Sequence, residues 1–261
     1  MRFIVCIKQV PNTTEIKIDP QTNTLVREGV ESILNPFDAY AVEEAVRLKE
    51  AHGGTVVAIS MGPNQVESTL REAVSLGVDE IILLSDRKFA GADTWATSYT
   101  LAAAIKYLGE FNLIITGQQA IDGDTAQVGP GIAAHLDIPQ TCFVRKVEAI
   151  DENKIRVQRL MENGFDTVEM CTPALISVVK EINTPRLPSL RGKRNAKNAQ
   201  LKVLTAEDLG LDEHRIGLNG SPTQVLNIFS PKHEKQVEKF DGDSDEAVEL
   251  IIRRLDQFTK R

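Results

Sequence analysis

The sequence has few of the residues on which disulfide-rich, metal-binding and membrane-spanning proteins depend. Its three cysteines, Cys6, Cys142 and Cys171, are odd in number, far apart and without CxxC or zinc-ligand spacing, and its four histidines show no metal-binding spacing. No apolar run approaches the roughly 18 residues of a membrane span, and the run 3–7 is too short for a signal-peptide core. We therefore expect a prokaryotic cytoplasmic protein without a disulfide scaffold, a metal site or membrane insertion.

A surplus of basic residues is also lacking. The 30 Lys and Arg face 37 Asp and Glu, which gives a net charge of -7 and argues against nucleic acid or an anionic membrane as the main partner. No Ser or Cys stands in a nucleophile elbow, so hydrolytic catalysis has no visible machinery and we expect no catalytic side chain. The remaining composition, 42% hydrophobic and 26% charged, is that of a soluble globular protein of one large or two modest domains.

Short β-branched runs alternate with helical patterns in the first two thirds of the chain. The runs predict strands at 3–7, 55–60, 80–84, 112–116 and 173–179, and apolar spacings of three and four predict helices at 36–52, 65–76 and 94–108. The first helix has Asn35 as a candidate N-cap, Pro36 at its first position and glycines at its end. This alternation predicts an α/β fold, a mostly parallel sheet with helices on both faces. Hairpins are expected at 15–27 and between 155–161 and 167–171, across the turn 162–165.

The character of the sequence changes after residue 182. Residues 183–202 contain no acid and six basic side chains, and the remainder, which ends in an amphipathic segment at 245–259, has too few apolar residues for a core of its own. We expect a nucleotide-binding domain at 1–182, followed by an exposed basic arm and a tail, 183–261, that packs on another surface.

A long polar loop follows the predicted strand 112–116, where open α/β sheets bind ligands. We expect a helix from about Thr125, capped by Asp124, whose free amides suit a phosphate. Asp122 and Asp124 would repel phosphate, so ribose hydroxyls or backbone amides are their expected partners. A purely structural loop and cap fits the same residues, and both interpretations stay open. The GxGxxA pattern from Gly129 falls inside this helix and indicates close helix packing more than a dinucleotide fingerprint.

Five separated blocks of the sequence resemble the beta subunits of electron-transfer flavoproteins. They are VCIKQVP from Val5, NPFD from Asn35 with AVEEAVRLK from Ala41, MGP from Met61, the Gly117–Gly131 segment, and VQRLME from Val157 with VEMCTPALIS from Val168. The resemblance covers nearly the whole chain, although Asn163 and Asp166 depart from the usual residues. It implies an adenine-nucleotide alpha-hydrolase-like fold and an alpha subunit that carries most of the site for the exchanging FAD.

The resemblance also implies a second nucleotide on the beta subunit, FAD in electron-bifurcating members and AMP in respiratory ones. Carried over by position, the cofactor-binding residues are Cys6, Asn35, Pro36, Phe37, Asp38, Met61, Gly117, Gln118, Gln119, Ala120, Ile121, Asp122, Gly123, Asp124, Thr125, Ala126, Gln127 and Val128. The loop with Gly123 and Ala126 resembles the bifurcating form. That form implies NADH as donor, with one electron passing through the alpha-subunit FAD to an acyl-CoA dehydrogenase or related flavoenzyme and the other to ferredoxin or flavodoxin.

The basic arm resembles the family's loop for recognising the partner dehydrogenase. Leu190 occupies the position of the apolar anchor. The basic side chains of Arg191, Lys193, Arg194 and Lys197 are expected to steer an acidic partner surface, and the tail from about residue 201 is expected to wrap the alpha subunit. Arg191 stands where many relatives have proline. Two other classes with a similar α/β layer account less well for the sequence. A universal-stress-type nucleotide-sensing regulator would not need the basic arm or the tail. An adenylating enzyme needs a glycine-rich pyrophosphate loop after the first strand, where this chain has the residues from Lys8 to Pro11.

Overall fold

The computed structural model describes residues 1–12, 32–226, 239 and 242–259, which form two compact units, Met1–Leu226 and Asn227–Arg261. The described part of the second unit contains helix α6 (Ser244–Thr259), so the amphipathic segment expected at 245–259 is helical. The first unit ends 44 residues later than the boundary expected after residue 182, because the segment beyond that boundary packs on the sheet. The expected hairpin at 15–27 lies outside the described residues. No helix in the described part of the chain is long and apolar enough to cross a membrane.

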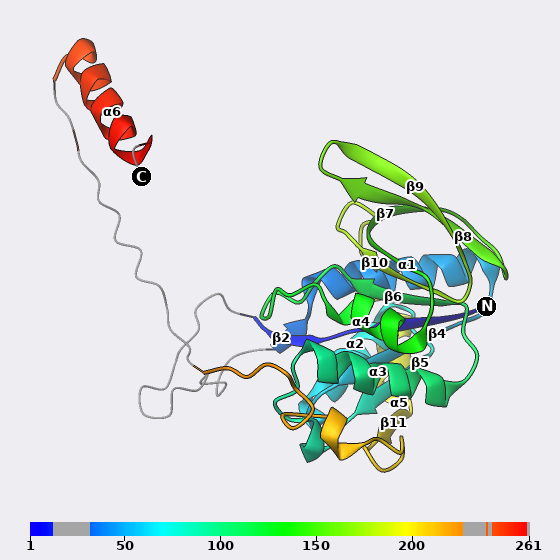
Figure 1. Cartoon of the computed structure of the whole chain (residues 1–261). Coiled ribbons are helices and arrows are strands. Elements are labelled where there is room, and N and C mark those ends of the chain that lie inside the picture. Colours follow the sequence, from blue (N-terminus) through cyan, green and yellow to red (C-terminus); the bar gives the residue numbers. More distant parts are fainter. Residues whose placement is uncertain (13–31, 227–238, 240–241, 260–261) are drawn as a thin grey trace. The chain divides into compact units, whose positions relative to one another are not determined.

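The first unit is built on one nine-stranded sheet with the order β11-β5-β4-β1-β6-β10-β7-β8-β9 (Figure 1). Its strands are β1 (Arg2–Cys6), β4 (Thr55–Met61), β5 (Glu80–Leu84), β6 (Leu113–Gly117), β7 (Gln140–Ile150), β8 (Lys154–Met161), β9 (Gly164–Cys171), β10 (Ala174–Val178) and β11 (Leu201–Leu204). Pairings from β11 to β7 are parallel, whereas β7, β8 and β9 pair antiparallel. A separate antiparallel pair joins β2 (Gln9–Pro11) to β3 (Ser32–Leu34). The mostly parallel α/β fold is confirmed.

Helices cover both faces of the sheet and enclose two hydrophobic cores. They are α1 (Pro36–His52), α2 (Glu67–Leu76), α3 (Thr94–Leu108), α4 (Val128–Leu136) and α5 (Leu190–Asn198), with short 3-10 turns at Asn64–Val66, Arg87–Phe89 and Glu213–Arg215. One core packs α1 and α2 against the sheet through side chains such as Val42 and Leu70. The other packs α3 and α4 through side chains such as Ile105 and Ile132. Alternate residues of β1 serve the two cores, because successive side chains on a strand point to opposite faces.

Two local expectations need correction, and one long strand was not predicted. The helix expected from about Thr125 begins at Val128, with Gln127 at its N-cap. The hairpin turn between β8 and β9 is shorter than the expected turn 162–165, because β8 runs to Met161 and β9 starts at Gly164. Strand β7 was not predicted, because its buried and exposed positions follow no regular two-residue alternation and its pairing with β8 shifts register twice.

The basic segment after residue 182 is not a free arm. Its residues 190–198 form α5, which packs on α2, and Gly192 sits so close to α2 that an added Cβ would lie 2.1 Å from the backbone oxygen of Ser75. The tail from about residue 201 begins as β11, paired with β5, and its residues Leu204, Ala206 and Ile216 are buried in the second core. These contacts within the chain explain why the first compact unit extends to Leu226. Wrapping of a partner by the tail stays a prediction.

Candidate nucleotide-binding site and recognition segment

The candidate site lies where the sheet reverses its strand order. After β1 the chain forms β4 on one side of it and later β6 on the other, so that Cys6, Met61 and Gly117 end three neighbouring parallel strands. A reversal of this kind opens a crevice at the carboxyl ends of the strands, where open α/β sheets bind ligands. Three predicted site residues from distant parts of the chain therefore meet at one edge.

The first turn of α1 closes this edge with a buried carboxyl group. The backbone amide of Lys8 donates a 2.7 Å hydrogen bond to Oδ2 of Asp38, and burial raises the pKa of Asp38 to about 7 although hydrogen bonds from Lys8, Asn35 and Gly117 favour its charged form. Burial, together with the charge of Asp38, raises the pKa of the Cys6 thiol to about 12. Cys6 is thus a neutral packing group at physiological pH, and Asp38 changes its charge there.

Asn35 connects α1 to the loop after β6. It stands at the N-cap of α1 as predicted, but its side chain makes no capping hydrogen bond. Instead its Nδ2 donates to the backbone oxygen of Gln119 at 2.8 Å, and its Oδ1 accepts from the backbone amide of Ile121 at 3.2 Å. The amide of Asp38, at the third position of the helix, donates instead to the backbone oxygen of Asn35 at 2.9 Å. The side chain of Asn35 therefore fixes the loop against the helix.

The loop itself is held by two acidic side chains in roles that the sequence did not show. Lys8 Nζ lies 2.6 Å from Oδ1 of Asp122 in an ion pair, so this carboxylate already has a cationic partner. Asp124 accepts a hydrogen bond from the side chain of Gln119 and does not cap α4. Both Asp124 and Ala126 have positive φ, 52° and 54°, which non-glycine residues rarely adopt. The loop thus holds a constrained turn just before α4.

The edge fits a phosphate-bearing nucleotide in three respects. The N-terminus of α4 faces the loop, and the side chain of its N-cap residue Gln127 makes no capping hydrogen bond there. Two buried hydroxyl oxygens on strands that end at this edge, Ser60 Oγ and Thr116 Oγ1, lack a hydrogen-bond partner within the described residues. Gly123 is exposed and a Cβ there would meet nothing within 4 Å, so no side chain at this position of the loop blocks a ligand.

At two other positions of the site, Gly117 and Gly129, the surrounding atoms leave little or no room for a side chain. A Cβ at Gly117 would lie 2.4 Å from Oδ1 of Asp38, and one at Gly129 would lie 3.0 Å from Oγ1 of Thr116. Inside α4, a Cβ at Gly131 would lie 2.5 Å from Oγ of Ser98 on α3, which confirms close helix packing as the origin of the GxGxxA pattern.

Within the candidate site the structure brings together the predicted strand ends, the first turn of α1 and the whole loop from Gly117 to Val128. Lys8, Ser60 and Thr116 were missed. Lys8 could have been found as the first charged residue after the strand 3–7, but its partner Asp122 is 114 positions away and nothing local indicates the pair.

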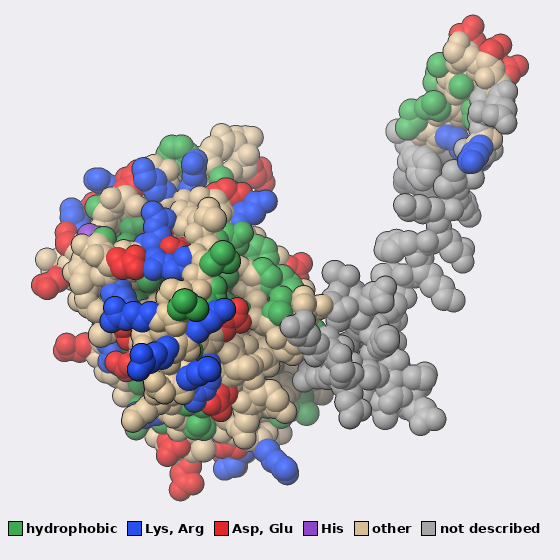
Figure 2. All heavy atoms as spheres, turned by 180° about the vertical axis from the view of Figure 1, so that it is seen from behind, with side chains coloured by type: hydrophobic (Ala, Val, Ile, Leu, Met, Phe, Trp, Pro, Cys, Tyr) green, Lys and Arg blue, Asp and Glu red, His purple; other side chains and the backbone are tan. Residues whose placement is uncertain are grey.

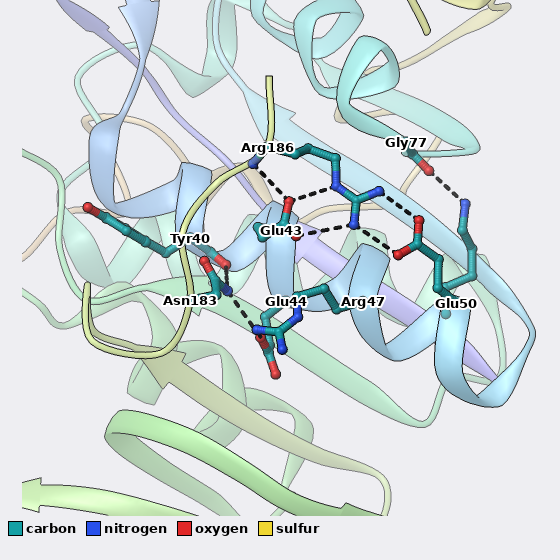
Figure 3. Close-up of polar contacts among 9 residues, drawn as sticks. Tyr40, Glu43, Glu44, Arg47, Glu50, Gly77, Asn183 and Arg186 are labelled. Atoms are coloured by element: carbon teal, nitrogen blue, oxygen red, sulfur yellow. Dashed lines mark hydrogen bonds and ion pairs between the residues drawn. The ribbon is translucent and has the colours of Figure 1, made fainter. Parts of the chain in front are cut away.

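The segment 183–190, where the family resemblance places a partner-recognition loop, is fixed to α1 by an ion-pair network (Figure 3). The guanidinium of Arg186 binds Glu43 through Nε at 2.8 Å and Glu50 through Nη1 at 2.6 Å, and its backbone amide also donates to Glu43. Just before it, Nδ2 of Asn183 donates to the backbone oxygen of Tyr40 and to Glu44. The two carboxylates raise the pKa of Arg186 above its usual value. Because the carboxylate of Glu43 is nearly buried, its ion pair with Arg186 is shielded from solvent and holds the segment against α1.

Beyond this tie the segment presents apolar and basic side chains to solvent. Leu187 and Leu190 are 89% and 88% exposed, which is extreme for leucine in a folded unit. Ser189 caps α5, on which Arg191, Lys193 and Arg194 are exposed and form no ion pair among the described residues. Figure 2 shows a face of the molecule on which Lys and Arg side chains gather with hydrophobic ones among them. The predicted partner-binding residues thus lie together on a surface that could contact another protein.

Comparison with known proteins identifies the family. The model of the electron transfer flavoprotein domain matches residues 22–209. The chain is 52% identical over 256 residues to the electron transfer flavoprotein subunit beta of Thermoanaerobacterium thermosaccharolyticum, covering 98% of each chain. It is 50% identical to the caffeyl-CoA reductase-Etf complex subunit CarD of Acetobacterium woodii, covering 88% of each, and 43% identical to protein FixA of Azotobacter vinelandii, covering 98% and 94%. With these relatives along nearly its whole length, the chain belongs to the electron transfer flavoprotein family and is a beta subunit of it.

Proposed function

We propose that this chain is the beta subunit of a heterodimeric, cytoplasmic electron-bifurcating flavoprotein. It binds an FAD at the carboxyl edge of β1, β4 and β6, where the flavin accepts a hydride from NADH and supplies its two electrons singly to two acceptors. One acceptor is the FAD of the alpha subunit, which passes its electron to an acyl-CoA dehydrogenase or related flavoenzyme. The other is ferredoxin or flavodoxin. No side chain of this chain acts as acid, base or nucleophile, because the cofactors supply the redox chemistry.

The observation that carries the proposal is the form of the loop before α4. It offers a helix N-terminus for a diphosphate, and Gly123 is open on its Cβ side, so a ligand longer than a mononucleotide has room to extend. The first turn of α1 and the strand ends then surround the adenosine part. The exposed side chain of Thr125 is a candidate for ligand hydroxyl groups, whereas Nε2 of Gln118 already donates to Oε1 of Gln119 at 3.0 Å.

The name of one relative supports the kind of partner. CarD is described as a subunit of a caffeyl-CoA reductase-Etf complex, which joins a reductase of a CoA ester to an electron transfer flavoprotein. The exposed Leu190 and the unpaired cations of α5 provide this chain with an apolar anchor in a basic rim, a composition suited to a transient acidic partner.

AMP is the alternative ligand. Both nucleotides share the adenosine and at least one phosphate, and the edge between Cys6 and Gly117 accommodates that shared part equally well. The two differ in what lies beyond the first phosphate, which is where Gly123 leaves space. With AMP on this subunit and one FAD on the alpha subunit, the heterodimer would be a simple electron carrier.

The deciding experiment is to co-express this chain with its alpha subunit and identify the released nucleotides by mass spectrometry. Two FAD per heterodimer are expected, together with rapid anaerobic flavin reduction by NADH and ferredoxin reduction that requires the second acceptor. One FAD with one AMP and no reduction by NADH would overturn bifurcation and leave the simple carrier. ATP alone, in a protein without flavin, would overturn both and indicate a nucleotide-sensing regulator.

A further inference from the structure

A second hollow of the first unit lies away from the nucleotide edge. It is a cavity of about 260 Å³ between α3, the end of α4 and the segment 209–215. Tyr99, Ala102, Ala103 and Lys106 line it at spacings of three and four, so they share one face of α3. His135 lines it from the last turn of α4, at the end opposite to the N-terminus that serves the candidate nucleotide site.

The charge of this lining is of one sign. Its titratable side chains other than Tyr99 are Lys106, His135 and Arg215, with no carboxylate, in a chain whose net charge is -7. Neither Lys106 nor Arg215 forms an ion pair with another described residue. Cations left unpaired around a hollow favour a ligand that supplies the missing negative charge.

The imidazole of His135 adds a specific group to this charge. Its Nε2 is buried and has no hydrogen-bond partner among the described residues, and such orphaned atoms are uncommon in folded proteins. Burial, and then the charges of Arg215 and Lys106, lower the pKa of His135. An oxyanion bound in the cavity would reverse that effect, because its negative charge stabilises the protonated imidazole.

Aromatic rings hold two of these groups in place before any ligand arrives. The guanidinium of Arg215 lies 4.0 Å from the ring centre of Tyr99. The ring of His135 meets Tyr99 edge-on at 5.6 Å and lies 4.7 Å from Trp95. Stacking of this kind restricts side-chain freedom and lowers the entropy lost on binding.

We propose that this cavity is a binding site for a small organic oxyanion, a phosphate or carboxylate on a compact carbon skeleton. Lys106 and Arg215 bind the anionic group, the imidazole of His135 in the lining responds to its charge, and the ring of Tyr99 with Ala102, Ala103, Leu209 and Leu211 contacts the apolar part. The site is independent of the nucleotide edge and of the proposed redox function.

The test is a titration of the purified full-length protein, with its partner subunit where it co-purifies, with inorganic phosphate and separately with succinate at constant ionic strength. Two-dimensional NMR of the histidine rings is the readout. We expect the resonances of His135 to shift and its apparent pKa to rise, while those of His52 stay unchanged. Preference for phosphate or for succinate identifies which oxyanion the site takes. Arg215→Gln and Lys106→Gln should each weaken binding about tenfold, because each removes a charged hydrogen-bond donor.

Lys180→Gln is the matched control, since Lys180 is an exposed cation away from the cavity and its loss should leave the affinity unchanged. Nucleotide content of each variant is measured alongside, and normal content shows that the first unit is folded. No shift of His135 with either probe, or equal losses in Lys180→Gln and Arg215→Gln, would overturn the proposal. Loss of the partner subunit from Arg215→Gln without any anion binding to the parent protein would also overturn it, because the cations would then serve a protein interface.

Discussion

The backbone amide of Lys8 and the carboxylate of Asp38 are joined by a 2.7 Å hydrogen bond that connects the end of β1 to the first turn of α1. The bond places an ionisable group with a pKa raised to about 7 at the centre of the candidate nucleotide site. Any ligand at this edge therefore meets a group whose charge changes close to physiological pH.

Asp38 should make the stability of the nucleotide-free protein depend on pH. Between its ordinary pKa of 3.8 and about 7 the folded state holds the proton more tightly than the unfolded chain, so the free energy of unfolding falls as pH rises through this window. The contribution is roughly 4 kcal/mol or less. Denaturant unfolding of the parent and of Asp38→Asn at several pH values measures it. The variant should lose this slope while also losing about 1–3 kcal/mol at all pH values from imperfect hydrogen bonding. Parallel curves for the two proteins would contradict the raised pKa.

Gly117 and Gly123 lie in the same loop and provide a matched pair. Gly117→Ala places a methyl group 2.4 Å from Oδ1 of Asp38, which forces α1 away from the strand end, whereas Gly123→Ala adds its methyl group to open space. We expect Gly117→Ala to lose most of its bound nucleotide and Gly123→Ala to retain a folded site. Nucleotide released per protein and the melting temperature are the measurements. A normal nucleotide content in Gly117→Ala would place the ligand elsewhere.

The contacts of Arg186 predict very different costs for its two carboxylate partners. Arg186→Gln leaves Glu43 nearly buried without a counter-charge and should destabilise the first unit by about 3–5 kcal/mol. Glu50→Gln removes only the exposed half of the network and should cost about 1 kcal/mol or less. Adding Glu43→Gln to Arg186→Gln should recover part of the loss. Urea unfolding of the parent, the two single variants and the double variant measures these free energies. Equal losses in Arg186→Gln and Glu50→Gln would show that burial of Glu43 does not determine the strength of the network.

The sequence predicted elements whose determinants are local. Asn35, Pro36 and Gly53 delimit α1 within one stretch of chain, and the strands that form the centre of the sheet are apolar enough to be recognised alone. Strand β11 could not be recognised, because four residues at Leu201–Leu204 become a strand only through pairing with β5.

The candidate site follows the same division. The loop from Gly117 was evident from its composition and from its place after a predicted strand, whereas Cys6, Met61 and the first turn of α1 were assigned by the family resemblance. The roles of individual side chains were not, because Asn35 bonds to residues more than 80 positions away and Arg186 to a carboxylate 143 positions away. Long-range partners of this kind have no pattern in the local sequence. The start of α4 was misplaced for a related reason, since Asp124 adopts a positive φ and bonds to Gln119.

Association with the electron-accepting flavoenzyme should depend on salt. Arg191, Lys193 and Arg194 are exposed and form no ion pair within the part of the chain that the structure describes, so they attract an acidic partner over a distance that salt shortens. Raising the ionic strength from about 0.01 M to 0.15 M shortens the screening length from about 30 Å to 8 Å. Stopped-flow kinetics should show a falling association rate with a dissociation rate that changes little. Charge-removing substitutions at these three positions should flatten the dependence, and a parent rate independent of salt would exclude steering by this surface.

Leu190 and Leu187 are equally exposed, yet only Leu190 begins α5 and corresponds to the expected anchor of the partner dehydrogenase. Leu190→Ala removes most of a side chain that we expect to be buried in the complex, and truncation of such an anchor typically costs about 2 kcal/mol or more in affinity. We expect at least a tenfold loss in the second-order rate of electron transfer to the dehydrogenase, with flavin content, reduction by NADH and melting temperature unchanged. Leu187→Ala removes the same number of atoms three residues earlier and should have a smaller effect. Equal losses in the two variants would assign the contact to the whole segment, and an unchanged rate in Leu190→Ala would remove this segment from the docking site.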